Sequence, residues 1–269
     1  MPGQDSGFET RAFPLSRRLV MDACEWGRKK HTIHIFAEID VTHARELLRD
    51  LKIRTGESLS FTAFVASCIG RTVAEDRMWH AYRRGMRLVL FHDVDIATLV
   101  ERQVEGEKLA TAFVIRSANT KTVREIHGEI RAAQQENIDS APGVDKWKAF
   151  LRLPRLVRML LYRLLDRNPA FRKRLAGTVL LTAVGMAAKG GGWGVPIASN
   201  TLTVTLGGIQ IKPGFVEGRI EPREYLCATV SFDHDIVDGM PAARFVARFR
   251  ELVEEASGLL GDHTAGVAP

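Results

Sequence analysis

The sequence predicts an α+β fold in which helices and strands are mixed without the strict alternation of βαβ units. Two observations support this prediction. Short segments rich in β-branched and apolar residues recur along the chain, and amphipathic segments of helical period separate only some of them. The chain has 269 residues, 45% apolar and 26% charged, so it can bury a full core as one large domain or two small ones.

The first third of the chain predicts three helices and one strand. Apolar residues recur among charges over residues 13–30, which is typical of a helix, and a β-branched strand follows over 32–40. Helices over 42–51 and 60–75 each begin with a hydroxyl residue suited to the N-cap. The last of these helices is apolar nearly all round, so we expect it to be buried.

The rest of the chain is richer in strands. Six runs of β-branched and apolar residues predict strands over 87–91, 94–100, 109–115, 178–184, 201–206 and 226–232. Thr120 opens a charged helix that runs to about residue 135. An amphipathic helix over 240–259 closes the domain, with Pro241 in its first turn.

Composition and charge argue against several classes of protein. Cys24, Cys68 and Cys227 lie far apart, so we expect no disulfide framework and a reducing, cytoplasmic location. We expect no signal peptide and no transmembrane segment. The net charge of +6 belongs to residues 146–175, which hold ten basic residues and one acidic residue, so the rest of the chain sums to −3. The charge is therefore local, and nucleic-acid binding is not expected.

His234 is the leading candidate for a catalytic residue. It lies in the run Ser231-Phe-Asp-His-Asp-Ile-Val-Asp-Gly239, at the end of a predicted strand. A residue in that place is held rigidly while its ring can face a cavity. A neutral imidazole, with an ordinary pKa of about 6.5, accepts a proton at physiological pH.

Simpler roles for these residues stay open on the residues alone. One histidine among eight is most often a surface or core residue, and Asp238 would serve as an N-cap. His234 and Asp238 could also be two metal ligands, but no third ligand lies at motif spacing. His31 and His34 would face opposite sides of a strand.

Residues 231–245 closely resemble the terminal signature of the 2-oxo acid dehydrogenase acyltransferases, the E2 catalytic domains, which share the His-x-x-x-Asp-Gly motif of chloramphenicol acetyltransferase. Residues 177–186 are similar to the family segment that carries the catalytic serine, with Thr182 in its place. Thr182 and His234 are 52 positions apart (234 − 182), as the family pattern leads one to expect. Upstream stretches in the family's order extend the resemblance over roughly 13–260, the basic segment excepted.

The resemblance implies a chloramphenicol acetyltransferase-like two-layer sandwich and direct acyl transfer between coenzyme A and a thiol, without a metal. In this reading His234 is the general base and Thr182 donates to the oxyanion. Asp238 pairs with Arg18, or with Arg17 as the fallback, and Gly239 makes a tight turn. Asp235 departs from the arginine common in the family, which puts the substrate pair in doubt.

The resemblance also implies a homotrimer whose active sites lie between subunits. No lipoyl domain fits before residue 13, so we expect a lipoyl group on a separate carrier protein or another acyl acceptor. The alternatives are a non-catalytic trimeric scaffold, or a membrane-surface acyltransferase with a lipid or polyketide-like acceptor.

The expected organisation is a flexible arm (1–12), the catalytic domain (13–260) with a basic helical insertion (146–175), and a tail (261–269). Within the insertion a helix is predicted over 154–167 and ended by Asn168-Pro169. Leucines would form one face and arginines the other. Such a helix packs on its own trimer, contacts a membrane surface peripherally, or serves as a lid or protein contact.

Overall fold

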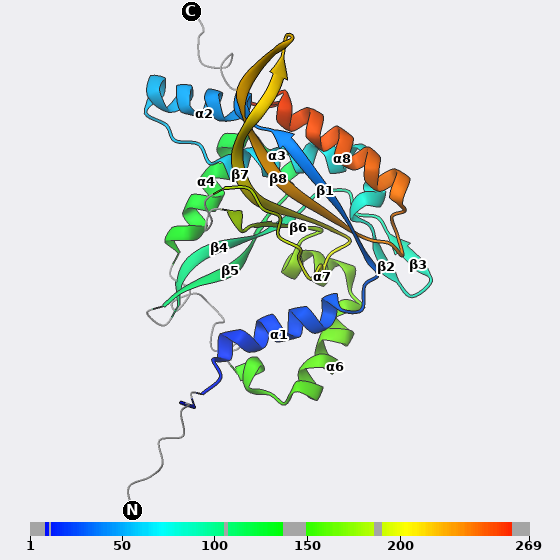
Figure 1. Cartoon of the computed structure of the whole chain (residues 1–269). Helices are drawn as coiled ribbons and strands as arrows, with labels where there is room; N and C mark the ends of the chain where they lie inside the picture. The colour runs from blue at the N-terminus through cyan, green and yellow to red at the C-terminus, as the bar shows by residue number, and fades with distance from the viewer. Residues whose placement is uncertain (1–8, 11, 105–106, 137–148, 186–189, 260–269) are drawn as a thin grey trace, which may run out of the picture.

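The computed structural model describes residues 9–10, 12–104, 107–136, 149–185 and 190–259. Its centre is a six-stranded mixed sheet with strand order β1-β8-β7-β6-β4-β5 (Figure 1). β6 runs parallel to both of its neighbours, and the other pairs are antiparallel. The strands are β1 (Thr32–Asp40), β4 (Ile96–Val104), β5 (Glu107–Ile115), β6 (Val179–Ala183), β7 (Leu202–Val216) and β8 (Arg219–Asp233).

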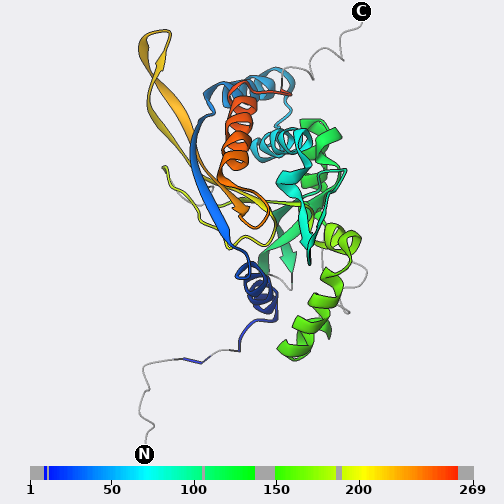
Figure 2. The same cartoon turned by 90° about the vertical axis from the view of Figure 1, so that its right-hand side faces the viewer.

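One face of this sheet is covered by helices (Figure 2). α3 is the central, buried helix and packs against α4 and α8, while α8 lies on β1 and α4 lies on β4 and β5. The helices of this layer are α2 (Thr42–Thr55), α3 (Phe61–Glu75), α4 (Val123–Gln135) and α8 (Gly239–Glu254). The predicted α+β architecture is thus confirmed, and so is the burial of α3.

The strands alternate between an apolar and a polar face. Leu181, Val204 and Val230 are buried against the helices in one continuous core. Burying a side chain of this size contributes roughly 1.5–3 kcal/mol, so this layer supplies most of the driving force. Because successive side chains point to opposite faces, the threonines between these positions lie on the other side of the sheet.

β7 and β8 are longer than the sequence predicts and form a ribbon that extends past the sheet (Figure 1). Glu217 and Gly218 join them, both with positive φ (49° and 79°), as a two-residue turn of type I′ requires. Gly207 and Gly208 form a bulge where the coil of residues 190–199 crosses the sheet. A side chain on Gly207 would collide with the carbonyl oxygen of Gly192.

A second group of helices lies at one end of the sheet, below it in Figure 1: α1 (Leu15–Gly27), α6 (Arg155–Asp166) and α7 (Pro169–Ala176). The predicted stop at Asn168 is confirmed. The sequence did not reveal that the same residue starts α7, where its side-chain oxygen accepts from the N–H groups of Ala170 and Phe171.

Some predicted boundaries were wrong by a few residues. Val41, not Thr42, is the N-cap of α2, because the Thr42 hydroxyl instead donates to Asp40. Thr122, not Thr120, caps α4 through a capping box with Glu125. The predicted strand over 87–91 is one half of a separate hairpin, β2 (Tyr82–Arg84) and β3 (Arg87–Val89), whose first strand was missed. Residues 1–8 and 260–269, in the expected arm and tail, lie outside the described residues.

A buried histidine joins the short 3-10 helix η1 (Arg77–His80) to the start of β6. His80 is almost fully buried, and its Nδ1 lies 2.9 Å from the hydroxyl oxygen of Thr178. Burial, reinforced by the nearby charge of Lys173, lowers the pKa of His80 to about 4. The folded protein therefore holds this ring neutral.

We expect the folded protein to lose stability as pH falls from about 6.5 towards 4, because the unfolded chain binds a proton at residue 80 that the folded chain excludes. The loss in the free energy of unfolding that comes from His80 reaches at most about 3 kcal/mol. Denaturant unfolding of the wild type and of His80→Gln across this range measures it. The free energy of unfolding of the variant should change less with pH than that of the wild type. An equal change in the two proteins would show that His80 is not the group responsible.

Candidate active site

His234 follows directly after the last residue of β8, and its backbone is anchored to two neighbouring segments. Its N–H donates to the carbonyl oxygen of His31 (2.8 Å), at the start of β1, and the N–H of Asp233 donates to Thr201 (2.9 Å). The N–H groups of Ile236 and Val237 both return to the carbonyl of Asp233 and close the turn. The His234 ring itself is about half exposed (47%). The backbone is thus held while the ring faces solvent.

Beneath this turn lies a buried ion pair. Lys30 Nζ donates to Asp233 Oδ2 at 2.5 Å, and the two side chains are only 12% and 7% exposed. The pair connects the end of α1 with the end of β8. Removing one member of such a pair leaves an uncompensated charge in a poorly solvated place, which makes the pair a strong local constraint.

Asp235, the departure from the family pattern, is held by a hydrogen bond and an ion pair. Its carboxylate lies 2.8 Å from His31 Nδ1 and 2.8 Å from an Arg83 guanidinium nitrogen. The hydrogen bond with His31 lowers the pKa of Asp235 against a small opposing effect of desolvation, and the charge of Arg83 lowers it further. Its negative charge is thus compensated locally. Asp235 ties the β2–β3 hairpin to the His234 turn.

The expected pairing of Asp238 with Arg18 is wrong within one chain. Arg18 lies on α1 and donates to the carbonyl oxygen of Leu151 (3.1 Å). Asp238 is the N-cap of α8, but its side chain makes no capping bond and is 82% exposed. Its Oδ1 lies 3.7 Å from His234 Nδ1, which is too long for a hydrogen bond but close enough for charge stabilisation.

Gly239 begins α8 with an ordinary φ, and a side chain there would meet nothing within 4 Å. The tight turn predicted for it is therefore not what this chain shows. No contact within one described chain explains the glycine.

Thr182 lies in β6, on the sheet face opposite the helices. Its register neighbours are Thr205 on β7 and, beyond it, Thr229 on β8. His234 comes five residues after Thr229, so it lies roughly 16 Å further along the sheet and two strands across, at about 3.3 Å per residue and 4.8 Å per strand. Within one chain the two predicted catalytic side chains are therefore far apart.

The polar face around Thr182 is partly covered by the coil of residues 190–199. A side chain on Gly194 would approach the methyl group of Thr205 to 3.1 Å. The ring of Trp193 contacts the ring of Phe36 in β1 edge to face, with the ring centroids 6.2 Å apart. The hydroxyl oxygens of Thr205, its strand neighbour Thr203 and the adjacent Thr229 are buried without a hydrogen-bond partner among the described residues. The same face holds His34, whose Nδ1 lies 2.8 Å from Ser231 Oγ.

Within the ranges that the structure describes, no three His, Cys, Asp or Glu side chains are grouped as a metal site would need. No described helix is long and apolar enough to cross a membrane. The His234 region places an imidazole next to a carboxylate, an arrangement suited to proton transfer.

Comparison with known proteins finds similarity to one family over the C-terminal part of the chain. Residues 163–261 match the model of the 2-oxoacid dehydrogenases acyltransferase (catalytic domain). A lipoamide acyltransferase component of a branched-chain alpha-keto acid dehydrogenase complex from Pseudomonas putida is 38% identical over 96 residues, 34% of this chain and 22% of that protein. The succinyltransferase component of the yeast (Saccharomyces cerevisiae) 2-oxoglutarate dehydrogenase complex is 32% identical over 70 residues, 25% of this chain and 15% of that protein. The aligned stretches thus span about a fifth of these relatives or less.

Solved structures agree over nearly the whole chain. A probable dihydrolipoamide acetyltransferase from Listeria monocytogenes has a TM-score of 0.69 at 18% identity, with 98% of this chain and 99% of that one covered. The Azotobacter vinelandii dihydrolipoamide acetyltransferase has a TM-score of 0.67 at 16% identity, covering 97% and 98%.

The protein therefore has the fold of an acyltransferase catalytic core. Its residues 163–261 match the catalytic-domain model of the 2-oxo acid dehydrogenase acyltransferases, so the resemblance seen in the sequence is confirmed over that stretch.

Reasoning from the sequence missed the residues that hold the His234 turn. Lys30 and Arg83 reach it from distant elements, and their pairing depends on the register of β1 against β8 and on an unpredicted hairpin. The opposite charges of Lys30 and Asp233 were the one available signal.

We expect Lys30→Met to lower the free energy of unfolding by about 3 kcal/mol, because Asp233 would stay buried and unpaired. Lys30→Met combined with Asp233→Asn should recover most of this loss. Chemical denaturation measures both. Lys212→Met is the matched control, since the side chains of Lys212 and its partner Glu38 are 36% and 37% exposed and the substitution should cost less than about 1 kcal/mol. Equal costs for the two lysines would contradict the prediction.

Proposed function

We propose that this protein is an acyltransferase that moves an acyl group between coenzyme A and a thiol of the dihydrolipoyl type. The observation that carries the proposal is the family match over residues 163–261, which includes both Thr182 and His234. The catalytic base and the oxyanion donor are assigned to these two residues. The acyl carrier would be a lipoyl group, or another acceptor would take its place.

The spacing of the site supports this assignment. Crystallographic and enzymatic work on the A. vinelandii acetyltransferase concerns a serine, a histidine and an asparagine in its catalytic mechanism, with the histidine 52 positions after the serine and the asparagine four further on. Here Thr182 and His234 are 52 positions apart and Asp238 follows four later. A hydroxyl and an imidazole are kept, while a carboxylate stands where that protein has a carboxamide.

The proposed reaction needs no covalent enzyme intermediate. His234 takes the proton of the incoming thiol, and the resulting thiolate attacks the acyl carbonyl carbon. The hydroxyl of Thr182 donates to the oxyanion of the tetrahedral intermediate. The intermediate then expels the other thiolate, which takes the proton back from the imidazolium. Because Nδ1 of His234 faces Asp238, Nε2 is the nitrogen left for the thiol, and the nearby carboxylate stabilises the imidazolium.

The distance between Thr182 and His234 within one chain supports a site built by two subunits. A cyclic trimer would bring His234 of one subunit to Thr182 of the next, and each subunit would serve two sites. The crystal structures of the related cores include the cubic core of a pyruvate dehydrogenase complex, which is a multisubunit assembly. The alternative is a non-catalytic scaffold with the same fold. Acyl-transfer activity in the wild-type protein would exclude this alternative.

We expect His234→Ala to lower acyl transfer from acetyl-CoA to dihydrolipoamide by about 10²- to 10⁴-fold, because the base is lost. Thr182→Val keeps the shape but removes the donor and should cost about 10²- to 10³-fold in kcat, while Thr182→Ser keeps the rate. Thr205→Val is the matched control, since it removes the neighbouring, unpartnered hydroxyl. Full activity in a folded His234→Ala protein would refute the proposal, as would equal losses in the two valine variants.

Mixing variants tests the two-subunit site. Equal amounts of His234→Ala and Thr182→Val subunits, unfolded and reassembled together, should regain about a quarter of the wild-type activity, since a random quarter of the interfaces joins an intact base to an intact donor. Each variant reassembled alone is the control. Reassembled mixtures that stay as inactive as the parents would place both groups of a site in one subunit.

A further inference from the structure

α1 and α6 form a helical pair that projects from the end of the sheet (Figures 1 and 2). Its inner contact is polar. The Arg158 guanidinium is only 4% exposed and donates two hydrogen bonds of 2.8 Å to the Asp22 carboxylate. Arg155 pairs with Glu25 at 3.0 Å, and Tyr162 packs edge-on against Trp26. Salt bridges therefore hold the two helices together.

The outer surface of the pair is apolar. Leu156, Leu160 and Leu164 follow one another at four-residue spacing on α6 and are 84%, 58% and 49% exposed. Phe13 and Met21 at α1 are also exposed. The sequence predicted leucines on one face and solvated arginines on the other, with the leucines against a second subunit, a membrane or another contact; the structure corrects this for Arg158, which is buried within the chain. Among the described residues of one chain, nothing covers the exposed leucines of this pair.

Basic side chains accompany the exposed leucines. Arg163 comes seven residues after Leu156, which is about two helical turns, so it lies along the same side of α6, and Arg167 follows in the turn that ends the helix. Both are exposed. They therefore do not form the opposite face that the sequence pattern suggested. The outward surface combines leucines with positive charge.

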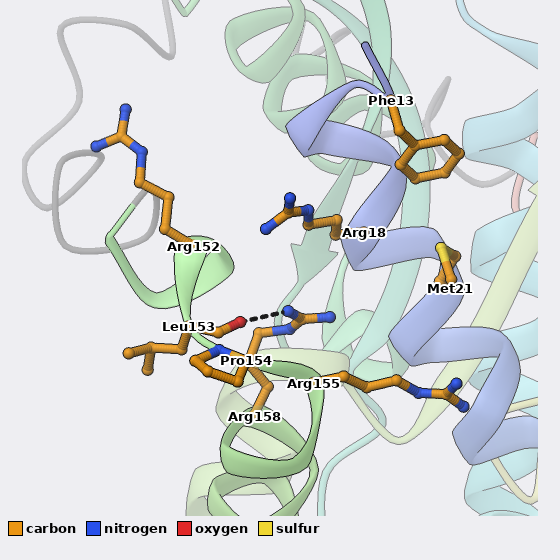
Figure 3. A pocket seen from close by; sticks show the side chains of 8 residues that line it. All are labelled: Phe13, Arg18, Met21, Arg152, Leu153, Pro154, Arg155 and Arg158. Atoms are coloured by element: carbon orange, nitrogen blue, oxygen red, sulfur yellow. Dashed lines mark hydrogen bonds between the residues drawn. The ribbon is translucent and has the colours of Figure 1, made fainter.

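A pocket of about 340 Å³ opens between α1 and the start of α6 (Figure 3). Its apolar lining comes from residues near the start of each helix, and four guanidinium groups surround it. The lining residues are Phe13, Arg18, Met21, Arg152, Leu153, Pro154, Arg155 and Arg158. Arg155 and Arg158 are neutralised by Glu25 and Asp22, whereas no carboxylate partner of Arg18 or Arg152 lies in the described part of the chain. The pocket suits a phosphate group joined to an apolar body.

We propose that the α1–α6 pair docks on an anionic lipid surface, with the leucines of α6 in the interface and a lipid phosphate among Arg18 and Arg152. Charge complementarity decides between this occupant and a second copy of the chain. The buried centre of a subunit interface is depleted of charge, and two such pairs face to face would bring arginines together. An anionic lipid surface accepts leucines and arginines at once.

Vesicle sedimentation with the full chain tests the inference. Phosphatidylcholine vesicles with about one third phosphatidylglycerol should bind the protein, and pure phosphatidylcholine should bind it much less. The variant Leu160→Ser/Arg163→Gln/Arg167→Gln should bind at least 30-fold more weakly, because each arginine near the surface contributes about fivefold and the leucine adds to this.

α2 offers a matched control. Ile53 is 81% exposed between the exposed Lys52 and Arg54, so Ile53→Ser/Lys52→Gln/Arg54→Gln removes the same two charges and one large apolar side chain. This variant should bind vesicles as the wild type does. Light scattering reports the assembly state of each protein.

Three outcomes would overturn the inference. These are no binding of the wild type to the anionic vesicles, an equal loss in the α6 and α2 variants, or dissociation of the assembly in the α6 variant alone. The last result would show that a second copy of the chain covers the leucines.

Discussion

The register of β8 between β1 and β7 is the constraint on which the rest of the structure depends. β8 pairs along most of its length with both neighbours, and its last residue, Asp233, lies opposite Thr32 of β1. This register brings Lys30 onto Asp233 and the carbonyl of His31 onto the N–H of His234. A slip of one residue would turn the buried face of β8 toward the polar side of the sheet. The same strand register therefore determines both the packing of the apolar core and the position of the His234 turn.

The same register explains why Thr182 and His234, the residues proposed as oxyanion donor and base, lie far apart within one chain. β6 is short and sits two strands from β8, so Thr182 comes level with the middle of β8 and not with its end. The hydroxyl groups of Thr203, Thr205 and Thr229 around it are buried, and no described residue forms a hydrogen bond with them. This costs stability unless another group or water reaches them. This polar face of the sheet is therefore suited to contact a substrate or a neighbouring subunit.

Local patterns in the sequence were enough to predict most elements. The alternation of apolar and polar residues, together with β-branched side chains, predicted β1 with its observed bounds. The hydroxyl of Ser60 correctly predicted the start of α3. His234 and Thr182 were found through their flanking residues, and no local property of Thr182 alone distinguishes it from other strand threonines. Contacts between distant segments could not be predicted this way. Lys30 with Asp233 and Asp22 with Arg158 are such contacts, since each pair comes together only through tertiary packing.

The ribbon of β7 and β8 beyond the sheet has a dynamic consequence. Ile211, Phe215 and Ile220 are exposed there, and an isolated two-stranded ribbon is only marginally stable in water. Its backbone amides should open and exchange with solvent deuterium at a lower free energy than those of the central strands. A neighbouring subunit that covers these side chains would slow that exchange. The exchange rate of the ribbon thus reports on contacts with neighbours independently of any activity.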